Sequence, residues 1–406
     1  YRIYIAEANG DKSSSSGSIY IQDAQAEIGL AATDYIESGA TTGKAGLLEN
    51  EPRLDYSGGA TCPALLLEPQ RSNLFPHSEY FGDWSTFRSS VSANEATSPE
   101  GLTNAYKLIQ QSGQTSSGGL FKGVTTIDAT TYTYTFFAKE AGYSWCFARL
   151  MGGANNYYAW FDLSNGIKGN VTNGATSAIE PYGNDWYRCS ITFANSGTLA
   201  IPHIYIAEAN SSTVVSNPDG VKGINIFGAQ IEAGSYQTSY IPTHGSSVTR
   251  NADTCFNNTD DFAGTDQVTL FAELDNNGND RIGSFFRFNL NENTSTAEWI
   301  FLGYESNKSV RFYVRSNAST SVDRSAGNYG AGVLKMAAKI DSEGNYKLFA
   351  NGVQISYGSN AVFSPSLNRV NIGQTNGITN MEDRVKQLSI FPTALTDSEC
   401  IALTTI

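Results

Sequence analysis

The chain has 406 residues, of which 40% are hydrophobic, 12% aromatic and only 16% charged. This hydrophobic content is sufficient for buried cores and excludes a disordered chain. Acidic residues outnumber basic ones by 39 to 26, and the net charge of −13 argues against a nucleic-acid partner. No apolar run approaches the roughly 20 residues that span a bilayer, so we expect no membrane insertion. The abundance of Tyr, Phe and Gly favours strands and turns over helices.

An internal repeat organises the chain. Residues 2–9 (RIYIAEAN) recur at 203–210 (HIYIAEAN) with seven of eight positions identical. Further along, residues 19–29 (IYIQDAQAEIG) match residues 224–234 (INIFGAQIEAG) at six of eleven positions. Such self-similarity indicates a duplicated structural module. The second copy closes a long β-patterned stretch and nothing precedes the first, so we expect residues 1–39 to be the C-terminal part of a truncated jelly-roll module.

The middle of the chain is predicted to hold the complete copy, at residues 77–250, after an ordered connector at 40–76 that packs one short strand. Alternating hydrophobic and polar residues in the complete copy predict strands separated by Gly- and Asn-rich turns. Besides the two repeated blocks, the predicted strands are Thr131–Ala138, Tyr157–Leu163 and Trp186–Phe193. Many short strands without intervening helices are typical of a β-sandwich or jelly roll.

The last predicted domain covers residues 251–406. Its predicted strands are Val268–Leu274, Ile282–Leu290, Glu298–Tyr304, Val310–Arg315, Gly332–Ile340 and Tyr346–Ala350. Their close spacing is typical of an all-β sandwich. Residues 341–345 predict a hairpin, and Asn351-Gly352 is a type I′ turn signal. The sequence Thr396-Asp397-Ser398-Glu399 is a capping box, which predicts one short helix.

The five cysteines are widely spaced and contain no CxxC pair: Cys62, Cys146, Cys189, Cys255 and Cys400. An odd number without such spacing is not typical of a secreted disulfide framework. Cys146 and Cys189 both lie in strand-like runs, and a bond between them stays an alternative to buried free thiols, which are the favoured interpretation.

Signatures of catalysis are sparse. The three histidines, His77, His203 and His244, form no HxH or HExxH motif, which argues against a zinc site. No GxSxG motif is present. Glu273 and Asp275 have the alternate spacing of paired glycosidase carboxylates, but a hairpin end explains them better. We therefore predict a non-enzymatic protein with no required cofactor; a glycosidase whose acids converge from separate strands stays an alternative.

One loop is a candidate calcium site. Asp275, Asn277, Asn279 and Asp280 offer oxygen atoms within a short stretch, as calcium prefers. The downstream bidentate glutamate of an EF-hand is missing from the pattern. Ordinary turn chemistry is therefore the favoured interpretation of these residues.

Aromatic side chains supply the candidate glycan contacts, because sugar recognition combines aromatic faces with polar groups for the hydroxyls. Tyr158 and Trp160 share the strand face opposite the expected core face. The aromatic candidates of the last domain are Trp299, Tyr304, Phe312 and Tyr313. Trp299 and Tyr304 lie at opposite ends of one predicted strand and are expected to flank a loop cleft. Structural packing is the alternative for all of these residues.

Two sets of motifs resemble known families. The last region resembles concanavalin-like, laminin-G-like sandwich domains through FAEL at 271–274, KLFANGVQIS at 347–356 and VKQLSIFPTALTDSECIAL at 385–403. The middle module resembles the jelly-roll carbohydrate-binding-like modules of bacteriophage fibre and spike proteins. The motifs there are LLLEPQRSNLFPHSEYF, WFDLSNGIKG, GNDWYRCSITF and FGAQIEAGSYQTSYIPT. The first copy departs from this pattern, with Glu37-Ser38 in place of Pro-Thr.

The resemblance implies an all-β fold of tandem antiparallel jelly-roll or β-sandwich modules ending in a concanavalin-like sandwich. It also implies a head-fibre, tail-fibre or spike subunit that binds a host cell-surface glycan during adsorption. Such a subunit would contact other virion proteins, form a homotrimer and reside in the virion after assembly in the host cytoplasm. Two alternatives stay open: the appended carbohydrate-binding region of a secreted polysaccharide-degrading enzyme, and a purely structural virion decoration protein.

Overall fold

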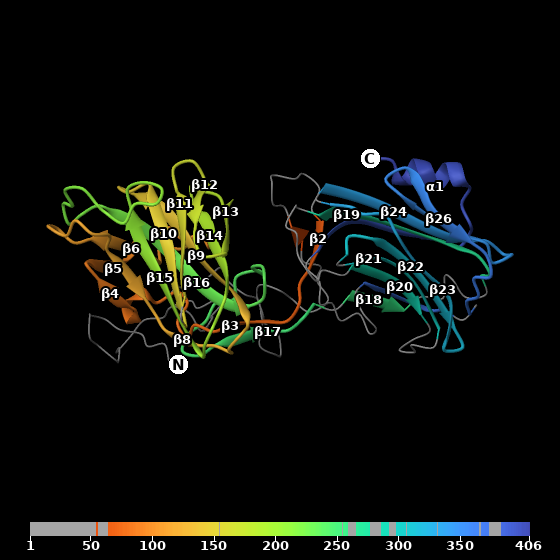
Figure 1. The fold of residues 1–406 in the computed structure, drawn as a ribbon, viewed down its shortest axis with the longest axis horizontal. Coiled ribbons are helices and arrows are strands. Elements are labelled where there is room, and N and C mark those ends of the chain that lie inside the picture. The colour runs from red at the N-terminus through yellow and green to blue at the C-terminus, as the bar shows by residue number, and fades with distance from the viewer. Residues whose placement is uncertain are drawn as a thin grey trace, which may run out of the picture. The chain divides into compact units, whose positions relative to one another are not determined.

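A computed structural model shows a protein built mainly of antiparallel β-sheets (Figure 1). The structure describes residues 54–55, 64–153, 155–253, 255–258, 265–276, 286–291, 298–305, 307–330, 332–364, 367–372 and 383–406. All of them belong to the unit Pro52–Ile406, so the first copy of the repeat lies outside the described residues. The sheets confirm the predicted all-β fold class. The domain limits drawn from the sequence stay predictions.

The first sandwich pairs two sheets, here named after their central strands. The β10 sheet has the order β12 (Ile167–Val171), β11 (Asn155–Asp162), β10 (Trp145–Gly152), β15 (Leu199–Ala207), β7 (Gly119–Phe121) and β4 (Ser85–Phe87), with β8 (Val124–Thr125) also on β15. The β9 sheet has the order β13 (Thr176–Pro181), β14 (Tyr187–Ala194), β9 (Thr131–Ala141), β16 (Gly223–Ala233), β6 (Ala105–Gln110) and β5 (Ser89–Ala96). A 3-10 turn, η2 (Phe81–Asp83), precedes β4. The chain crosses from one sheet to the other between β12 and β13, between β14 and β15 and between β15 and β16, as in a jelly roll.

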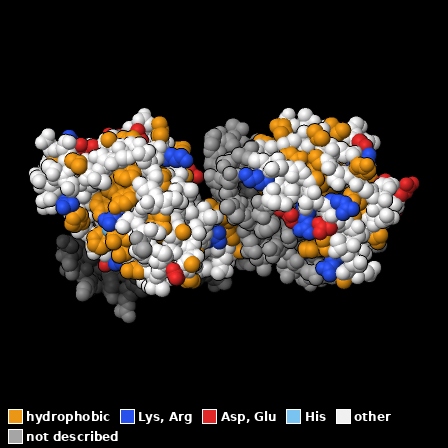
Figure 2. All heavy atoms as spheres, viewed as in Figure 1, with side chains coloured by type: hydrophobic (Ala, Val, Ile, Leu, Met, Phe, Trp, Pro, Cys, Tyr) orange, Lys and Arg blue, Asp and Glu red, His pale blue; other side chains and the backbone are white. Residues whose placement is uncertain are grey.

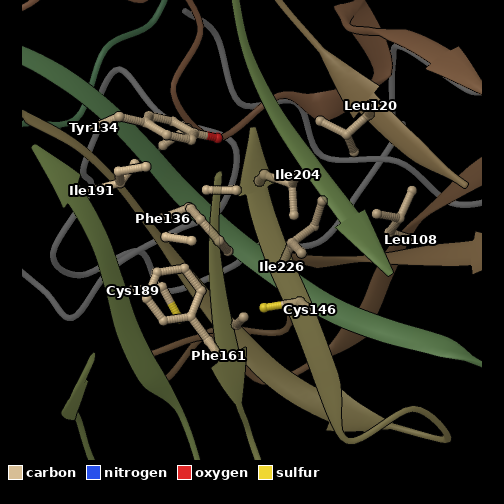
Figure 3. Close-up of a cluster of buried hydrophobic side chains, with 14 of the residues drawn as sticks. Leu108, Leu120, Tyr134, Phe136, Cys146, Phe161, Cys189, Ile191, Ile204 and Ile226 are labelled. Atoms are coloured by element: carbon tan, nitrogen blue, oxygen red, sulfur yellow. The ribbon is translucent and has the colours of Figure 1, made fainter. Parts of the chain in front are cut away.

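The core of this sandwich lies between the two sheets (Figure 3). Alternate residues of each strand fill it: Phe136 on β9 and Phe161 on β11 approach edge to face, with ring centroids 6.1 Å apart. Cys146 on β10 and Cys189 on β14 enter the same core from opposite sheets as free, buried thiols. The two cysteines therefore act as small core residues, in agreement with the favoured interpretation of the sequence.

The repeated Gln-x-Glu motif is a hydrogen-bonded clamp. Gln230 and Glu232 are both completely buried on β16, and the Gln230 amide donates to the Glu232 carboxylate over 2.7 Å. Glu232 accepts both the backbone N–H (2.8 Å) and the hydroxyl (2.7 Å) of Thr238, while Gln230 accepts the N–H of Ile241 (2.7 Å). These bonds fasten the segment after β16 back onto the strand. In this copy of the module, the motif therefore fixes the conformation of the chain after β16.

The second sandwich also pairs two sheets. The β19 sheet has the order β1 (Leu54–Asp55), β2 (Ala64–Leu67), β28 (Asp383–Phe391), β19 (Val268–Asn276), β24 (Gly332–Ile340), β25 (Tyr346–Ala350) and β26 (Val353–Gly358). The β21 sheet has the order β18 (Cys255–Asn258), β27 (Arg369–Ile372), β20 (Phe286–Asn291), β21 (Trp299–Tyr304), β22 (Val310–Ser316) and β23 (Ser319–Ala326). Within the predicted connector at 40–76, the apolar run Ala64–Leu67 forms β2, which pairs with β28. A separate two-stranded ribbon joins β3 (Arg71–Asn73) to β17 (Val248–Arg250).

The single described α-helix, α1 (Asp397–Thr404), covers the outer side of the β19 sheet (Figure 1). Cys400 is the buried contact of the helix, packed with Phe271 of β19 and Phe349 of β25. The predicted capping box is confirmed, because the Thr396 hydroxyl accepts the Glu399 N–H and the Glu399 carboxylate accepts the Thr396 N–H. Helix α1 is therefore started by its own local sequence and held by its apolar face.

The turns of this sandwich also follow the sequence. Asn351 and Gly352 both have positive φ, 47° and 79°, as the predicted type I′ turn between β25 and β26 requires. The hairpin between β24 and β25 closes with the N–H of Asp341 bonded to the carbonyl of Asn345 over 3.0 Å. Both turn predictions are confirmed.

Candidate functional site

The surface of the protein carries few charges. Figure 2 shows hydrophobic side chains gathered in patches on both sandwiches, among uncharged polar side chains and backbone, with Lys, Arg, Asp and Glu scattered between them. A surface of this kind suits a ligand recognised through aromatic faces and neutral hydrogen bonds. Two outward-facing aromatic clusters, one on each sandwich, are therefore the candidate sites.

The first cluster is a row of rings across the outer face of the β10 sheet. Strand alternation places Tyr158 and Trp160 on this face, opposite the core side chains of β11. Neighbouring ring centroids are 4.7–5.7 Å apart along the row, whose members are Tyr158, Trp160, Phe147, Tyr205, His203 and Phe121. The structure therefore brings the two sequence-predicted residues of this sandwich together.

Most of this row is covered. Trp160 is only 5% exposed, and its indole N–H donates to the carbonyl of Ser212 over 3.0 Å. The same segment also contacts β12: the Asn170 backbone N–H donates to the side-chain oxygen of Asn210 (2.8 Å), and the Asn170 side-chain amide donates to the Ser211 hydroxyl (2.6 Å). Tyr158 stays partly exposed beside the Arg149 guanidinium, 5.7 Å from the ring centroid. Trp160 is thus a packing residue, and of the two sequence-predicted residues only Tyr158 has a partly exposed side chain.

His203 is the titratable member of the row. Its ring stacks between Phe121 and Tyr205, at centroid distances of 4.9 and 5.5 Å, and its Nδ1 donates to the Ile201 carbonyl over 2.9 Å. Burial is the main cause that lowers the pKa of His203 from 6.5 to about 4, although the bond to Ile201 opposes the shift. His203 is therefore neutral near pH 7 and serves as a flat stacking partner.

The second cluster lies on the outer face of the β21 sheet, and we call it the platform: Trp299, Phe301 and Tyr313. Phe301 and Tyr313 stack across β21 and β22 with centroids 5.2 Å apart, and Trp299 meets both edge to face at 5.6 and 5.7 Å. Phe301 is buried, whereas Trp299 and Tyr313 are partly exposed. The platform is thus an open aromatic surface supported by a buried ring.

Polar groups border the platform. The Arg311 guanidinium lies over Tyr313 and Phe301, 5.4 and 5.6 Å from the ring centroids. It donates two bonds to Asp323, of 2.8 and 2.9 Å, and one to Glu305, of 2.7 Å. These bonds to Asp323 and Glu305 raise the pKa of Arg311 above its usual value, so its charge is permanent. The Arg311 side chain is therefore held in one position beside the rings of the platform.

Tyr304 lies on the opposite side of its strand from Trp299. It is 6% exposed in the core of the sandwich, and its hydroxyl donates to the Tyr329 carbonyl over 2.5 Å. The expectation that Trp299 and Tyr304 flank one cleft is corrected, because residues five apart on a strand point to opposite faces. Phe312 is likewise in the core, while Tyr313 joins the platform. Phe301 and Arg311 were missed, although the alternate spacing 299–301 and 311–313 was a usable signal.

The other predicted sites are placed only in part. Asp275 is the second-last residue of β19. Asn277, Asn279 and Asp280 lie outside the described residues, so the calcium site stays a prediction. No group of three or more His, Cys, Asp or Glu able to hold a metal occurs within the described part of the chain. Glu273 pairs with its cross-strand neighbour Lys335, with 3.6 Å between the carboxylate oxygen and Nζ. Among the residues that the structure describes, no helix has the length and apolarity to cross a membrane.

Comparisons with known proteins assign no family to this chain. No protein-family model matches the sequence, and a search of curated proteins gives no match. Among solved structures, a carbohydrate-binding module (CBM40) of the Ruminococcus gnavus IT-sialidase is 18% identical, with a TM-score of 0.30 over 35% of this chain and 84% of that chain. The leech intramolecular trans-sialidase is 16% identical, with a TM-score of 0.31 over 38% of this chain and 26% of that one. The SAP-like pentraxin of Limulus polyphemus is 12% identical, with a TM-score of 0.27 over 35% of this chain and 70% of that one.

Proposed function

We propose that this protein binds glycans without cleaving them, and that the platform on the β21 sheet is the binding surface. The observation that supports this proposal most is the open aromatic pair Trp299 and Tyr313 beside fixed polar groups. The apolar face of a pyranose ring packs on aromatic rings, and the sugar hydroxyls bond to neighbouring polar side chains. Buried Phe301 keeps the exposed rings in position, so little order is lost when a ligand binds.

The carboxylates beside the platform support binding over catalysis. Asp323 uses both oxygens on Arg311, and Glu305 bonds the same guanidinium. A glycosidase needs one carboxyl group that holds a proton and a second that stays ionised near the scissile bond. Carboxylate oxygens that already accept hydrogen bonds from a fixed guanidinium are not free to approach a glycosidic oxygen or an attacking water. Asp323 and Glu305 therefore act as structural partners of Arg311 in this proposal.

The particular role that we propose is a fibre or spike subunit of a bacteriophage virion that binds a host cell-surface glycan. The sequence motifs that resemble such proteins support this role. The proposal places the protein in the virion, in contact with other virion proteins and as a homotrimer, since three copies of a weak site gain avidity. Mass photometry of the intact protein tests the trimer, and a monomer at all concentrations would contradict it.

A glycan array probed with the full chain tests the proposed function. We expect the wild-type protein to bind a subset of glycans and Trp299→Ala to lose about tenfold or more in affinity, because the variant removes the exposed ring. Tyr357→Ala is the matched control: Tyr357 is 72% exposed on β26 of the other sheet and should leave binding unchanged. Absence of binding by the wild type would favour a purely structural decoration protein. Release of reducing sugar from a bound glycan would favour the polysaccharide-degrading alternative.

A further inference from the structure

We propose that the folded first sandwich holds strand β2 against β28 and thereby stabilises the second sandwich, which carries the platform. The order of the strands carries this inference. Strand β2 precedes residues 71–250, which contain β3 to β17, yet it lies in the β19 sheet among strands that follow those residues. Residues 71–250, here called the insert, therefore interrupt the second sandwich between β2 and β18.

The dependence of the two cores on each other runs in one direction. Leu67 of β2 is only 3% exposed and lies in the core of the second sandwich, and Leu65 packs against that core. Leu65 is the cross-strand partner of Val385 on β28, which belongs to the same core. By contrast, every residue of the buried cluster in the first sandwich lies within the insert. The second sandwich thus needs a strand from before the insert, whereas the core of the insert needs none from outside.

The two ends of the insert are held together by its own fold. Strands β3 and β17 pair antiparallel, with Arg71 opposite Arg250, so the chain enters and leaves the insert about 5 Å apart (Figure 1). Arg71 also anchors β3 to β16, because its Nε lies 3.7 Å from a carboxylate oxygen of the buried Glu232. Unfolding of the insert would release both ends.

Glu68, the residue after β2, fastens that strand to the far end of the insert. Its N–H donates to the Asp253 carboxylate over 2.7 Å, and the Asp253 N–H donates to the Glu68 carbonyl over 2.9 Å. The Glu68 carboxylate, in a side chain only 2% exposed, bonds the Arg250 guanidinium and accepts the N–H of Ser239 over 2.7 Å. Arg250 and Ser239 belong to the insert, so these two bonds depend on its fold.

The physical consequence is a change in the effective concentration of β2 at β28. While the insert is folded, its paired ends keep β2 close to the strand on which it packs. After the insert unfolds, only a long flexible chain tethers β2, and its effective concentration falls roughly as the −3/2 power of the chain length. Strand β2 would then detach more often and leave the backbone edge of β28 open to solvent.

Hydrogen exchange of the full chain in urea, read by mass spectrometry, tests this holding role. Phe136→Ala removes a completely buried ring from the first core and should unfold the insert at a urea concentration that leaves the wild-type insert folded, as its β9 peptide reports. There we expect β28 amides to exchange about tenfold or more faster than in the wild type. Ile127→Ala is the matched control: Ile127 is 71% exposed in the insert, and its variant should exchange like the wild type.

A disulfide shows whether the paired ends of the insert carry the effect. Ser72 and Thr249 are cross-strand partners whose hydroxyl oxygens lie 2.7 Å apart, so Ser72→Cys with Thr249→Cys should form a disulfide between β3 and β17. Added to Phe136→Ala, the disulfide should restore slow exchange in β28 while the β9 peptide still exchanges as unfolded, and its reduction should remove that protection. Unchanged β28 exchange in Phe136→Ala, or fast exchange with the disulfide formed, would overturn the holding role.

Discussion

The side-chain amide of Asn73 donates a 2.9 Å hydrogen bond to the main-chain carbonyl of Ile241, which lies 168 residues further along the sequence. The same amide nitrogen donates to the carbonyl of Ala229 over 3.1 Å, and the amide oxygen accepts the N–H groups of Phe75 and Ile231, both over 3.2 Å. Asn73 is completely buried. One side chain therefore joins β3, the middle of β16 and the segment that the Gln-x-Glu clamp holds.

Replacement of Asn73 by Ala should destabilise the first sandwich strongly. The variant leaves two carbonyls and two N–H groups without their buried partner, so we expect a loss of about 3 kcal/mol or more in the free energy of unfolding. Urea unfolding followed by tryptophan fluorescence measures the change. Ser72→Ala is the control, because the exposed Ser72 hydroxyl bonds only Thr249 and its removal should cost less than about 0.5 kcal/mol. Equal stability of the two variants would refute the joining role of Asn73.

The strand pattern of the interior was predictable because alternation and burial coincide there. The predicted strand Thr131–Ala138 is contained in β9, and the predictions Gly332–Ile340 and Tyr346–Ala350 match β24 and β25. The polar strands β5 and β23 were not predicted, since each lies at a sheet edge and buries few side chains. An edge strand is specified by its neighbour's free backbone groups, and its own sequence carries little of that signal.

For the candidate sites, the sequence allowed prediction of the sheet face on which the aromatic side chains lie, but not of their exposure to solvent. Alternation correctly put Tyr158 and Trp160 on the face opposite the core, yet no local pattern reveals that the carbonyl of Ser212 comes to lie on the Trp160 indole. That contact joins residues 52 apart, and it depends on how the segment after β15 folds back. The openness of Trp299 and Tyr313 is likewise a property of packing between strands.

The core thiols should be chemically inert in the native protein. Burial raises the pKa of Cys189 far above its usual value and that of Cys400 to about 11, so little reactive thiolate exists at pH 8. We expect Cys146, Cys189 and Cys400 to resist iodoacetamide in the folded protein and to react after unfolding in guanidinium chloride, as read by peptide mass spectrometry. Rapid labelling of Cys189 in the native protein would show that the core opens or is packed differently.

His203 should make the first sandwich less stable in acid. Its pKa is about 4 in the folded protein against 6.5 when exposed, so the unfolded chain takes up the proton first. Stability from this residue is complete above pH 6.5 and falls as the pH drops toward 4, by about 3 kcal/mol in total. His203→Phe keeps a flat stacking ring without titration and should flatten this part of the profile of unfolding free energy against pH. Parallel profiles for the two proteins between pH 4 and 6.5 would contradict the assignment.

Glu79 should have the opposite effect to His203 and make the folded protein less stable at alkaline pH. Burial, with the nearby Glu100 carboxylate as the second cause, raises the pKa of Glu79 from 4.5 to about 7, although the Tyr240 hydroxyl donates to it over 3.1 Å and opposes the shift. The folded protein therefore keeps the proton longer than the unfolded chain. Stability from Glu79 is complete below pH 4.5 and is lost as the pH rises through 7, by about 3 kcal/mol.

The variant Glu79→Gln isolates this effect, because the neutral amide retains an oxygen for Tyr240 and never ionises. We expect its unfolding free energy to match the wild type near pH 4.5 and to exceed it by about 2–3 kcal/mol at pH 8. Glu95→Gln is the control, since Glu95 is exposed and bonded only to Ser92, and it should track the wild type at both pH values. A constant difference between Glu79→Gln and wild type from pH 4.5 to 8 would mean that Glu79 ionises normally in the folded protein.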